Sequence, residues 1–211
     1  MRNSLVITGD ISGFTKVDSR NREILVNSTR ELMTSWAGSR DARLFRGDSF
    51  QMLFHDASEG LKRCIQLRCW LKKNRLLADV TLDARMAVGV GEIAFFGESV
   101  LDSDGEAFHI SGRTFDAMEG DEFFKVITAH PELNNQLAVI CNLLDLIISG
   151  WTRNQAEVIY LALEGKTQQQ MADELNIVQS AINNRLKLAH WKQIEKTIHY
   201  ISALIQPDGH I

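Results

Sequence analysis

The stretch Gly9-Asp-Ile-Ser-Gly-Phe-Thr15 is the most informative part of the first half of this sequence. It follows the apolar run Leu-Val-Ile, which predicts a strand over residues 4 to 9 and places Asp10 where that strand ends. Glycine permits positive φ and a close backbone approach, so Gly9 and Gly13 could let main-chain amides face an anion while Asp10 holds its metal ion. Asp and Gly also form ordinary turns after strands, and that alternative stays open.

The composition is that of an ordinary folded protein. The chain has 211 residues, of which 45% are hydrophobic and 24% charged, and this suits one large or two small domains. No apolar run approaches the roughly 18 residues that span a bilayer, and the N-terminus does not resemble a signal peptide, so we expect a cytoplasmic protein without a membrane partner.

The three cysteines lack the paired spacing of zinc sites or disulfide frameworks, which predicts thiols, mostly buried. The net charge of −4 argues against general nucleic-acid binding but leaves room for a local basic face.

Apolar periodicity and turn residues predict the elements of the first 130 residues. A strand at 4–9 is followed by a helix at 21–37, a hairpin with strands at 42–46 and 50–54, and a second helix with Leu61, Cys64 and Ile65 on its buried face. A long strand at 80–90, a helix at 105–118 and a strand at 123–128 complete the set. The order β-α-β-β-α-β, then α-β, predicts an α+β fold, a ferredoxin-like and mostly antiparallel sheet with helices on one face.

This topology brings Asp10 close to the hairpin that contains Asp48. The first strand lies centrally beside a hairpin strand in such a sheet, so the two carboxylates are expected to converge at one edge. A hard cation such as Mg²⁺ binds through one or two carboxylates together with substrate phosphates. The sequence therefore predicts a divalent-metal site at Asp10 and Asp48.

The pattern changes near residues 129 to 131. From 132 to 149 apolar residues recur at intervals of three and four, which predicts a helix with one continuous stripe that Gly150 ends. We therefore divide the chain into a domain at 1–130, a connector helix at 131–150 and a C-terminal domain at 151–211. The stripe from Leu133 to Ile148 could align two copies of the chain in a homodimer.

Residues 151 to 211 have the pattern of a helix-turn-helix. Capping-box spacings at Thr152 and Thr167 open two helices, and Asn176 tolerates the left-handed conformation that a tight turn between helices needs. A third helix starts near residue 179, and its outward side chains can hydrogen-bond base edges or phosphates. These candidate DNA-binding residues are Gln179, Ser180, Asn183, Asn184 and Lys187.

With both aspartates placed, the first domain resembles the class III nucleotidyl cyclase domain. The segment from Gly9 to Thr15 is similar to the family's first metal-binding segment, Arg46-Gly-Asp48 to its second, and Arg85-Met-Ala-Val-Gly89 to the strand that follows. The segment from Asp102 to Arg113 is similar to the one that runs from the base-selecting position into the helix with the catalytic Asn and Arg. The resemblance implies Mg²⁺ or Mn²⁺ at Asp10 and Asp48, with nucleotide contacts from Gly9, Ile11, Ser12, Gly13, Phe14 and Asp102.

Two positions depart from the cyclase pattern. Leu44 stands where adenylyl cyclases read the purine with a lysine, and His109 stands at the position of the catalytic asparagine. A leucine cannot hydrogen-bond a base edge, and an imidazole differs from an amide in donors and in shape. The resemblance therefore implies nucleotide binding rather than turnover. Arg113, at the position of the transition-state arginine, and His109 are the candidate catalytic residues if turnover remains.

The C-terminal unit resembles helix-turn-helix domains of the sigma-factor region-four and LuxR-like kind. It departs from them at Val178, where Ser or Thr usually caps the recognition helix. The combination of both parts looks like the SatD family of bacterial proteins over nearly the whole chain. Our leading hypothesis is a homodimeric, DNA-binding transcription regulator with a nucleotide-sensing or dimerisation domain. A metal-dependent nucleotidyl cyclase or transferase and a protein-interaction module without ligand are the alternatives.

Overall fold

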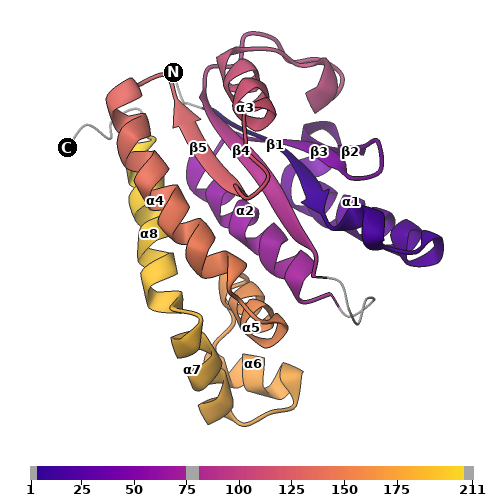
Figure 1. Ribbon diagram of the computed structural model, residues 1–211, viewed down its shortest axis with the longest axis vertical. Coiled ribbons are helices and arrows are strands. Elements are labelled where there is room, and N and C mark those ends of the chain that lie inside the picture. The colour runs from indigo at the N-terminus through magenta and orange to yellow at the C-terminus, as the bar shows by residue number, and fades with distance from the viewer. Residues whose placement is uncertain (1–3, 75–80, 207–211) are drawn as a thin grey trace.

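β1 is the central strand of a five-stranded mixed sheet in the computed structural model, which describes residues 4–74 and 81–206 (Figure 1). The strand order is β2-β3-β1-β4-β5. β1 runs antiparallel to both β3 and β4, β2 runs antiparallel to β3, and β5 runs parallel to β4. The central place that the sequence predicted for the first strand is therefore confirmed. The strands are β1 (Ser4–Ser12), β2 (Ala42–Phe45), β3 (Ser49–Phe54), β4 (Asp83–Gly91) and β5 (Phe124–Thr128).

β1 is longer than the sequence predicted. It continues to Ser12 instead of ending at residue 9, because Asp10 pairs with Ser49 of β3 and with Arg85 of β4. Asp10 therefore lies inside a strand, where its side chain points to one face of the sheet, and not in the loop that follows. β4 begins at Asp83, and the predicted start of this strand at residue 80 lies outside the described residues.

Eight α-helices are present in the described residues. The first extends beyond the predicted range of 21–37 because the Asp18 side chain caps it at its start, and it is interrupted at Gly38, where φ is 88°. Two short 3-10 helices, η1 (Phe14–Lys16) and η2 (Val100–Asp102), precede α1 and α3. The α-helices are α1 (Ser19–Asp41), α2 (Ala57–Lys72), α3 (Glu106–Asp116), α4 (Pro131–Ser149), α5 (Arg153–Leu163), α6 (Gln168–Leu175), α7 (Gln179–Leu188) and α8 (Trp191–Leu204).

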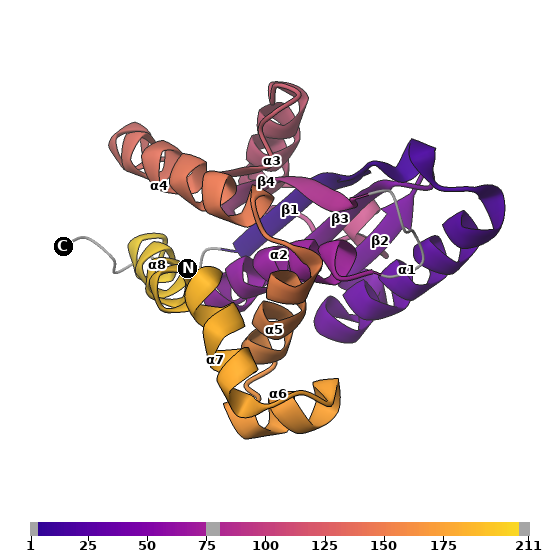
Figure 2. The same cartoon turned by 60° about the horizontal axis from the view of Figure 1, so that its bottom comes forward.

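Helices cover both faces of the sheet, so the predicted one-sided arrangement is wrong (Figure 2). Successive side chains of a strand point to opposite faces. Leu5 of β1 belongs to the large core with α1 and α2, whereas Val6 packs on the other face with Phe108 of α3. α3 approaches the sheet closely because Gly89 has no side chain, and a Cβ there would stand only 2.2 Å from the carbonyl oxygen of Ala107.

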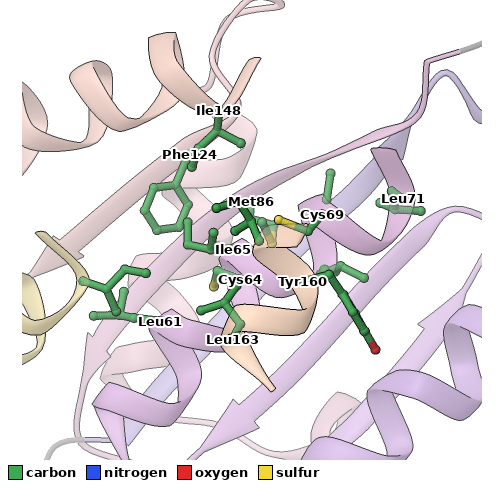
Figure 3. Close-up of a cluster of buried hydrophobic side chains, with 14 of the residues drawn as sticks. Leu61, Cys64, Ile65, Cys69, Leu71, Met86, Phe124, Ile148, Tyr160 and Leu163 are labelled. Carbon is green, nitrogen blue, oxygen red and sulfur yellow. The ribbon is translucent and has the colours of Figure 1, made fainter. Parts of the chain in front are cut away.

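The C-terminal helices pack on the first half of the chain. α5 and α8 contact α2, and α4 contacts β5 (Figure 1). Figure 3 shows the resulting buried cluster, in which Ile65 of α2, Phe124 of β5, Ile148 of α4 and Leu163 of α5 lie together. The apolar stripe predicted on α4 is used here, since Leu137, Cys141, Leu144 and Ile148 are buried within the chain. This stripe is therefore not free to align two copies.

The three cysteines are buried, as predicted. Burial raises the pKa of the Cys141 thiol to about 12. Within residues 4–74 and 81–206, no helix combines the length and the apolar character that crossing a bilayer requires.

Candidate functional site

The first candidate site lies on the α3 face of the sheet, near the end of β1. Thr8 and Asp10 point to this face, because they alternate with Ile11, which belongs to the core on the opposite face. Thr8 is hydrogen-bonded to Ser111 of α3 at 3.0 Å and accepts a hydrogen bond from the Gln51 amide at 3.2 Å. α3 thus covers the middle of β1. Asp10 lies one step further along, with 30% of its side chain exposed.

The structure places Asp48 beside Asp10. Asp48 precedes Ser49, the partner of Asp10 in the ladder between β1 and β3. The carbonyl oxygen of Asp48 accepts a hydrogen bond from the Ile11 N–H at 3.0 Å. The hairpin turn before it needs a left-handed backbone at Gly47, where φ is 89°, which a glycine adopts without steric cost. Cross-strand pairing, and not loop geometry, therefore brings the two carboxylates together.

An arginine to which the sequence analysis gave no role holds Asp10. Arg85 faces it across the ladder between β1 and β4, and its Nη1 lies 3.8 Å from Asp10 Oδ2. Arg85 is itself fixed, because its Nη2 donates to the Met118 carbonyl at 3.2 Å and its guanidinium lies 5.6 Å from the centroid of the Phe115 ring. Partial burial raises the pKa of Asp10 above its ordinary value of 3.8, Arg85 opposes this rise, and the charge of Asp48 adds to it.

Asp10 and Asp48 are the two candidate ligands for a divalent cation. Asp10 Oδ1 is buried and has no hydrogen-bond partner, so one carboxylate oxygen is left for a cation. The parts of the chain that the structure describes hold no group of three His, Cys, Asp or Glu side chains that could enclose a metal ion. Mg²⁺ or Mn²⁺ held by Asp10 and Asp48 would therefore complete its coordination with phosphate oxygens or water.

The remaining residues of the Gly9 to Thr15 segment have different surroundings. Gly9 lies inside β1, where a Cβ would stand 2.4 Å from the Arg85 carbonyl oxygen, so close packing accounts for this glycine. Gly13 has a φ of 84° and begins η1, so it makes the turn that leaves the strand. Ile11 and Phe14 are buried in the large core, whereas Ser12 and Gly13 are half-buried at the end of the strand.

Leu44 and the predicted site residues Asp102, His109 and Arg113 have other surroundings than Asp10. Leu44 is buried in the core that contains α1 and α2. Asp102 is exposed at the end of η2, where it accepts a hydrogen bond from the Ser99 hydroxyl at 2.7 Å. His109 Nε2 lies 3.1 Å from Asp104 Oδ1. Arg113 is exposed, and it follows by two positions the serine of α3 that faces the sheet, so it leaves the helix on the other side.

A second group of charged residues is buried between α2, β4 and α4. Arg68 is fully buried; its Nε and Nη2 donate to Asp83 at 2.8 and 2.9 Å, and its Nη1 donates to Asp145. Lys72 Nζ lies 3.0 Å from Asp83. Two cations and two carboxylates thus neutralise each other. The sequence analysis missed this cluster, although a single aspartate beside the apolar stripe of α4 was a signal that it has a buried partner.

The second candidate site is the outer surface of α7. The predicted capping boxes at Thr152 and Thr167 are confirmed, and Asn176 has the left-handed conformation expected between α6 and α7, with φ 51°. Val178 begins α7 without a side-chain cap, as predicted. Buried Ile182 and Leu186 anchor the helix. Of the predicted DNA-binding residues, Gln179, Ser180, Asn184 and Lys187 are exposed and Asn183 is half-buried.

The basic residues near α7 do not all face solvent. Arg185 Nη1 lies 3.5 Å from Glu157 Oε2 of α5, so this arginine joins α7 to α5. Lys187, Lys192 and Lys196 are exposed. α6 and α7 project away from the sheet, which leaves this side of the molecule open (Figure 2).

A comparison with models of known protein families gave no match, and neither did a comparison with curated proteins. The chemistry of the two candidate sites is therefore what indicates a function.

Proposed function

We propose that this protein is a cytoplasmic, DNA-binding transcription regulator of the SatD-like kind. Its cyclase-like domain binds a nucleotide together with a divalent cation, and its helix-turn-helix, α6 with α7, reads DNA. The observation that carries the proposal is α7 itself, a short helix that is anchored by buried leucine and isoleucine on one side and presents uncapped amides and polar side chains to solvent on the other.

The strand order supports the ferredoxin-like part of this proposal. The β-α-β-β-α-β unit gives β2-β3-β1-β4, with α1 and α2 packed on one face. α3 and β5 extend this unit. α3 is joined to β1 by the hydrogen bond between Ser111 and Thr8, two residues before Asp10.

The geometry of α7 suits the major groove. Gln179 and Ser180 lie at its start, and side chains at the start of a recognition helix contact base edges. Asn184 and Lys187 follow at helical spacing along the same side. Lys192 of α8 continues the basic surface towards phosphates. Because these cations are few, one copy should bind DNA only weakly, and useful affinity should require two copies.

The charged groups around Asp10 suit a phosphorylated ligand. Asp10 has an unpaired, buried oxygen, Asp48 adds a second carboxylate, and Arg85 supplies a fixed positive charge. A nucleotide with Mg²⁺ or Mn²⁺ satisfies all three groups at once. Such a ligand would regulate DNA binding only if it favours one arrangement of the protein over another.

Gel-shift experiments on enriched genomic fragments test the proposal. We expect sequence-preferring binding by the wild type at moderate salt, and a loss of this preference in Asn184→Ala. Asn27→Ala, which removes an equally exposed asparagine on α1, serves as the control and should bind as the wild type does. Equal binding of all fragments by the wild type would contradict the proposal.

A metal-dependent nucleotidyl cyclase or transferase is the second candidate. Arg113 favours it, since this arginine points outwards from α3 and could serve the Asp10 site of a second copy, where it would stabilise developing phosphate charge. The buried Leu44 and the contact of His109 with Asp104 favour binding without turnover. Turnover of ATP or GTP with Mn²⁺ that disappears in Asp10→Asn would make this candidate the better one.

A further inference from the structure

The outer side of α4 carries an apolar stripe that the fold does not use. Val139, Leu143 and Leu146 follow one another at helical spacing, and they are 61%, 58% and 74% exposed. They lie on the side of α4 away from the buried stripe that packs on β5. Large apolar side chains that gather on one exposed face commonly mark an interaction site.

A groove continues this stripe towards α8. It has a volume of about 420 Å³ and lies between α4 and α8. Tyr200 of α8, 47% exposed, borders it opposite Leu143. The apolar side chains of the groove include Ile140, Leu144 and Ile147 from α4 and Ile194 from α8.

We propose that this α4–α8 surface, made of the exposed stripe and the groove, binds a second copy of the chain around a two-fold axis. The exposed face of α4 lacks charge, which favours this occupant, although Lys196 of α8 also lines the groove. From residue 135 to residue 149 the exposed side chains of α4 are uncharged, and the one carboxylate, Asp145, turns inwards to Arg68. A two-fold interface sets a surface against itself, so a charge near the axis would meet its own copy. Nucleic acid, by contrast, binds to cationic surfaces.

The size of the surface also fits a second copy. Val139, Leu143, Leu146 and Tyr200 together leave on the order of 400 Å² of side chain exposed, about half of the roughly 800 Å² that each partner contributes to a standard interface. The rims of α4 and α8 can supply the remainder.

This dimer would place the two α7 helices for a two-fold DNA site, a consequence that rests on the proposed function. Tyr200 lies nine residues beyond Trp191, the first residue of α8, and therefore about 14 Å along the helix. A two-fold axis near Tyr200, with α8 lying across it, would therefore place the two α7 helices at least about 30 Å apart. Half-sites one helical turn apart on DNA have centres about 34 Å apart.

Sedimentation velocity over a range of concentrations tests the interface. We expect the wild type to be a dimer at micromolar concentration, and Leu143→Glu to weaken dimerisation about 100-fold or more, because it buries a carboxylate against its own copy. The control, Ile24→Glu, changes a side chain that is 45% exposed on α1 and should leave the dimer intact. A monomeric wild type, or a Leu143→Glu variant that dimerises as the wild type does, would overturn the inference.

A cross-linking experiment keeps the inference testable if Leu143→Glu does not fold. Tyr200→Cys introduces a thiol at the exposed position near which the two-fold axis passes, so two such thiols come close together. We expect oxidation to link two chains through it, but not through Gln169→Cys on α6. Dimers that fail to cross-link through Tyr200→Cys would place the interface elsewhere. DNA binding by a monomer would overturn this inference alone, whereas a dimer of this kind without DNA binding would contradict only the proposed function.

Discussion

Arg68 on α2 donates to Asp145 on α4, and the same carboxylate accepts the backbone N–H groups of Phe123 and Phe124 at 2.7 and 3.0 Å. One aspartate therefore joins the connector helix both to the central helix of the first half and to the start of β5. α5 and α8 contact both α2 and α7, so packed helices connect the sheet with the proposed DNA-reading helix α7.

Removing the Asp145 carboxylate should destabilise the protein strongly. Asp145→Ala removes one of the two carboxylate partners of the buried Arg68 and leaves two backbone N–H groups without their acceptor. We therefore expect a loss of about 3–5 kcal/mol in the free energy of unfolding. Urea denaturation followed by circular dichroism measures it. Glu132→Ala, on an exposed part of the same helix, is the control. A loss below about 1 kcal/mol in Asp145→Ala would mean that the buried cluster does not hold α4.

Asp10→Asn should stabilise the protein without ligand at neutral pH. The pKa of Asp10 is raised in the folded protein, so its contribution to stability is complete below the ordinary value of 3.8 and is lost as pH rises through the folded value. An asparagine keeps the neutral form at every pH. The melting temperature of Asp10→Asn should therefore exceed that of the wild type increasingly as pH rises above 4. If Asp10→Asn is less stable than the wild type at pH 7, the ion pair with Arg85 stabilises the protein by more than burial of the Asp10 charge costs.

A bound nucleotide should make the wild type more stable than Asp10→Asn. A bound nucleotide with Mg²⁺ gives the Asp10 charge a partner, and a ligand at a hundred times its dissociation constant adds about 2.7 kcal/mol of stability. We expect this gain in thermal-shift measurements on the wild type and its absence in Asp10→Asn. An equal gain in both proteins would place the nucleotide elsewhere.

Two glycines near α3 should respond in opposite directions to alanine. In Gly89→Ala the added Cβ would clash with the backbone of α3, and we expect a loss of about 2 kcal/mol or more. Gly112, within α3, has no atom within 4 Å of an added Cβ. Because alanine favours helix, Gly112→Ala should gain about 0.5–1 kcal/mol. Thermal unfolding of the two variants checks this, and similar losses in both would show that α3 does not depend on the close approach at Gly89.

A cap at the start of α7 should stabilise the helix-turn-helix. Val178 has the extended backbone of a capping residue but no side-chain acceptor, so Val178→Ser should add about 1 kcal/mol. Thr167→Ala, which removes the cap of α6, should cost about as much. Chemical denaturation of both variants measures the pair. No gain from the serine would mean that water already satisfies the free amides of α7.

Local signals in the sequence were sufficient for the central strand, the hairpin, the capping boxes and the turn at Asn176. Each of these depends on residues close together in the chain. Other features depend on register and packing between distant segments. The pairing of Asp10 with Arg85 follows from how β1 and β4 align, and the place of α3 on the second face follows from its close approach at Gly89. The buried Arg68 cluster combines three segments that no spacing connects.

Selection of bound duplexes from a random pool tests whether α7 reads DNA. We expect the wild type to enrich an inverted repeat with half-site centres about 10 base pairs apart. A variant that combines Gln179→Ala with Asn184→Ala should retain its fold and lose this enrichment. The same sequences enriched by both proteins, or no sequence enriched by the wild type, would contradict the claim.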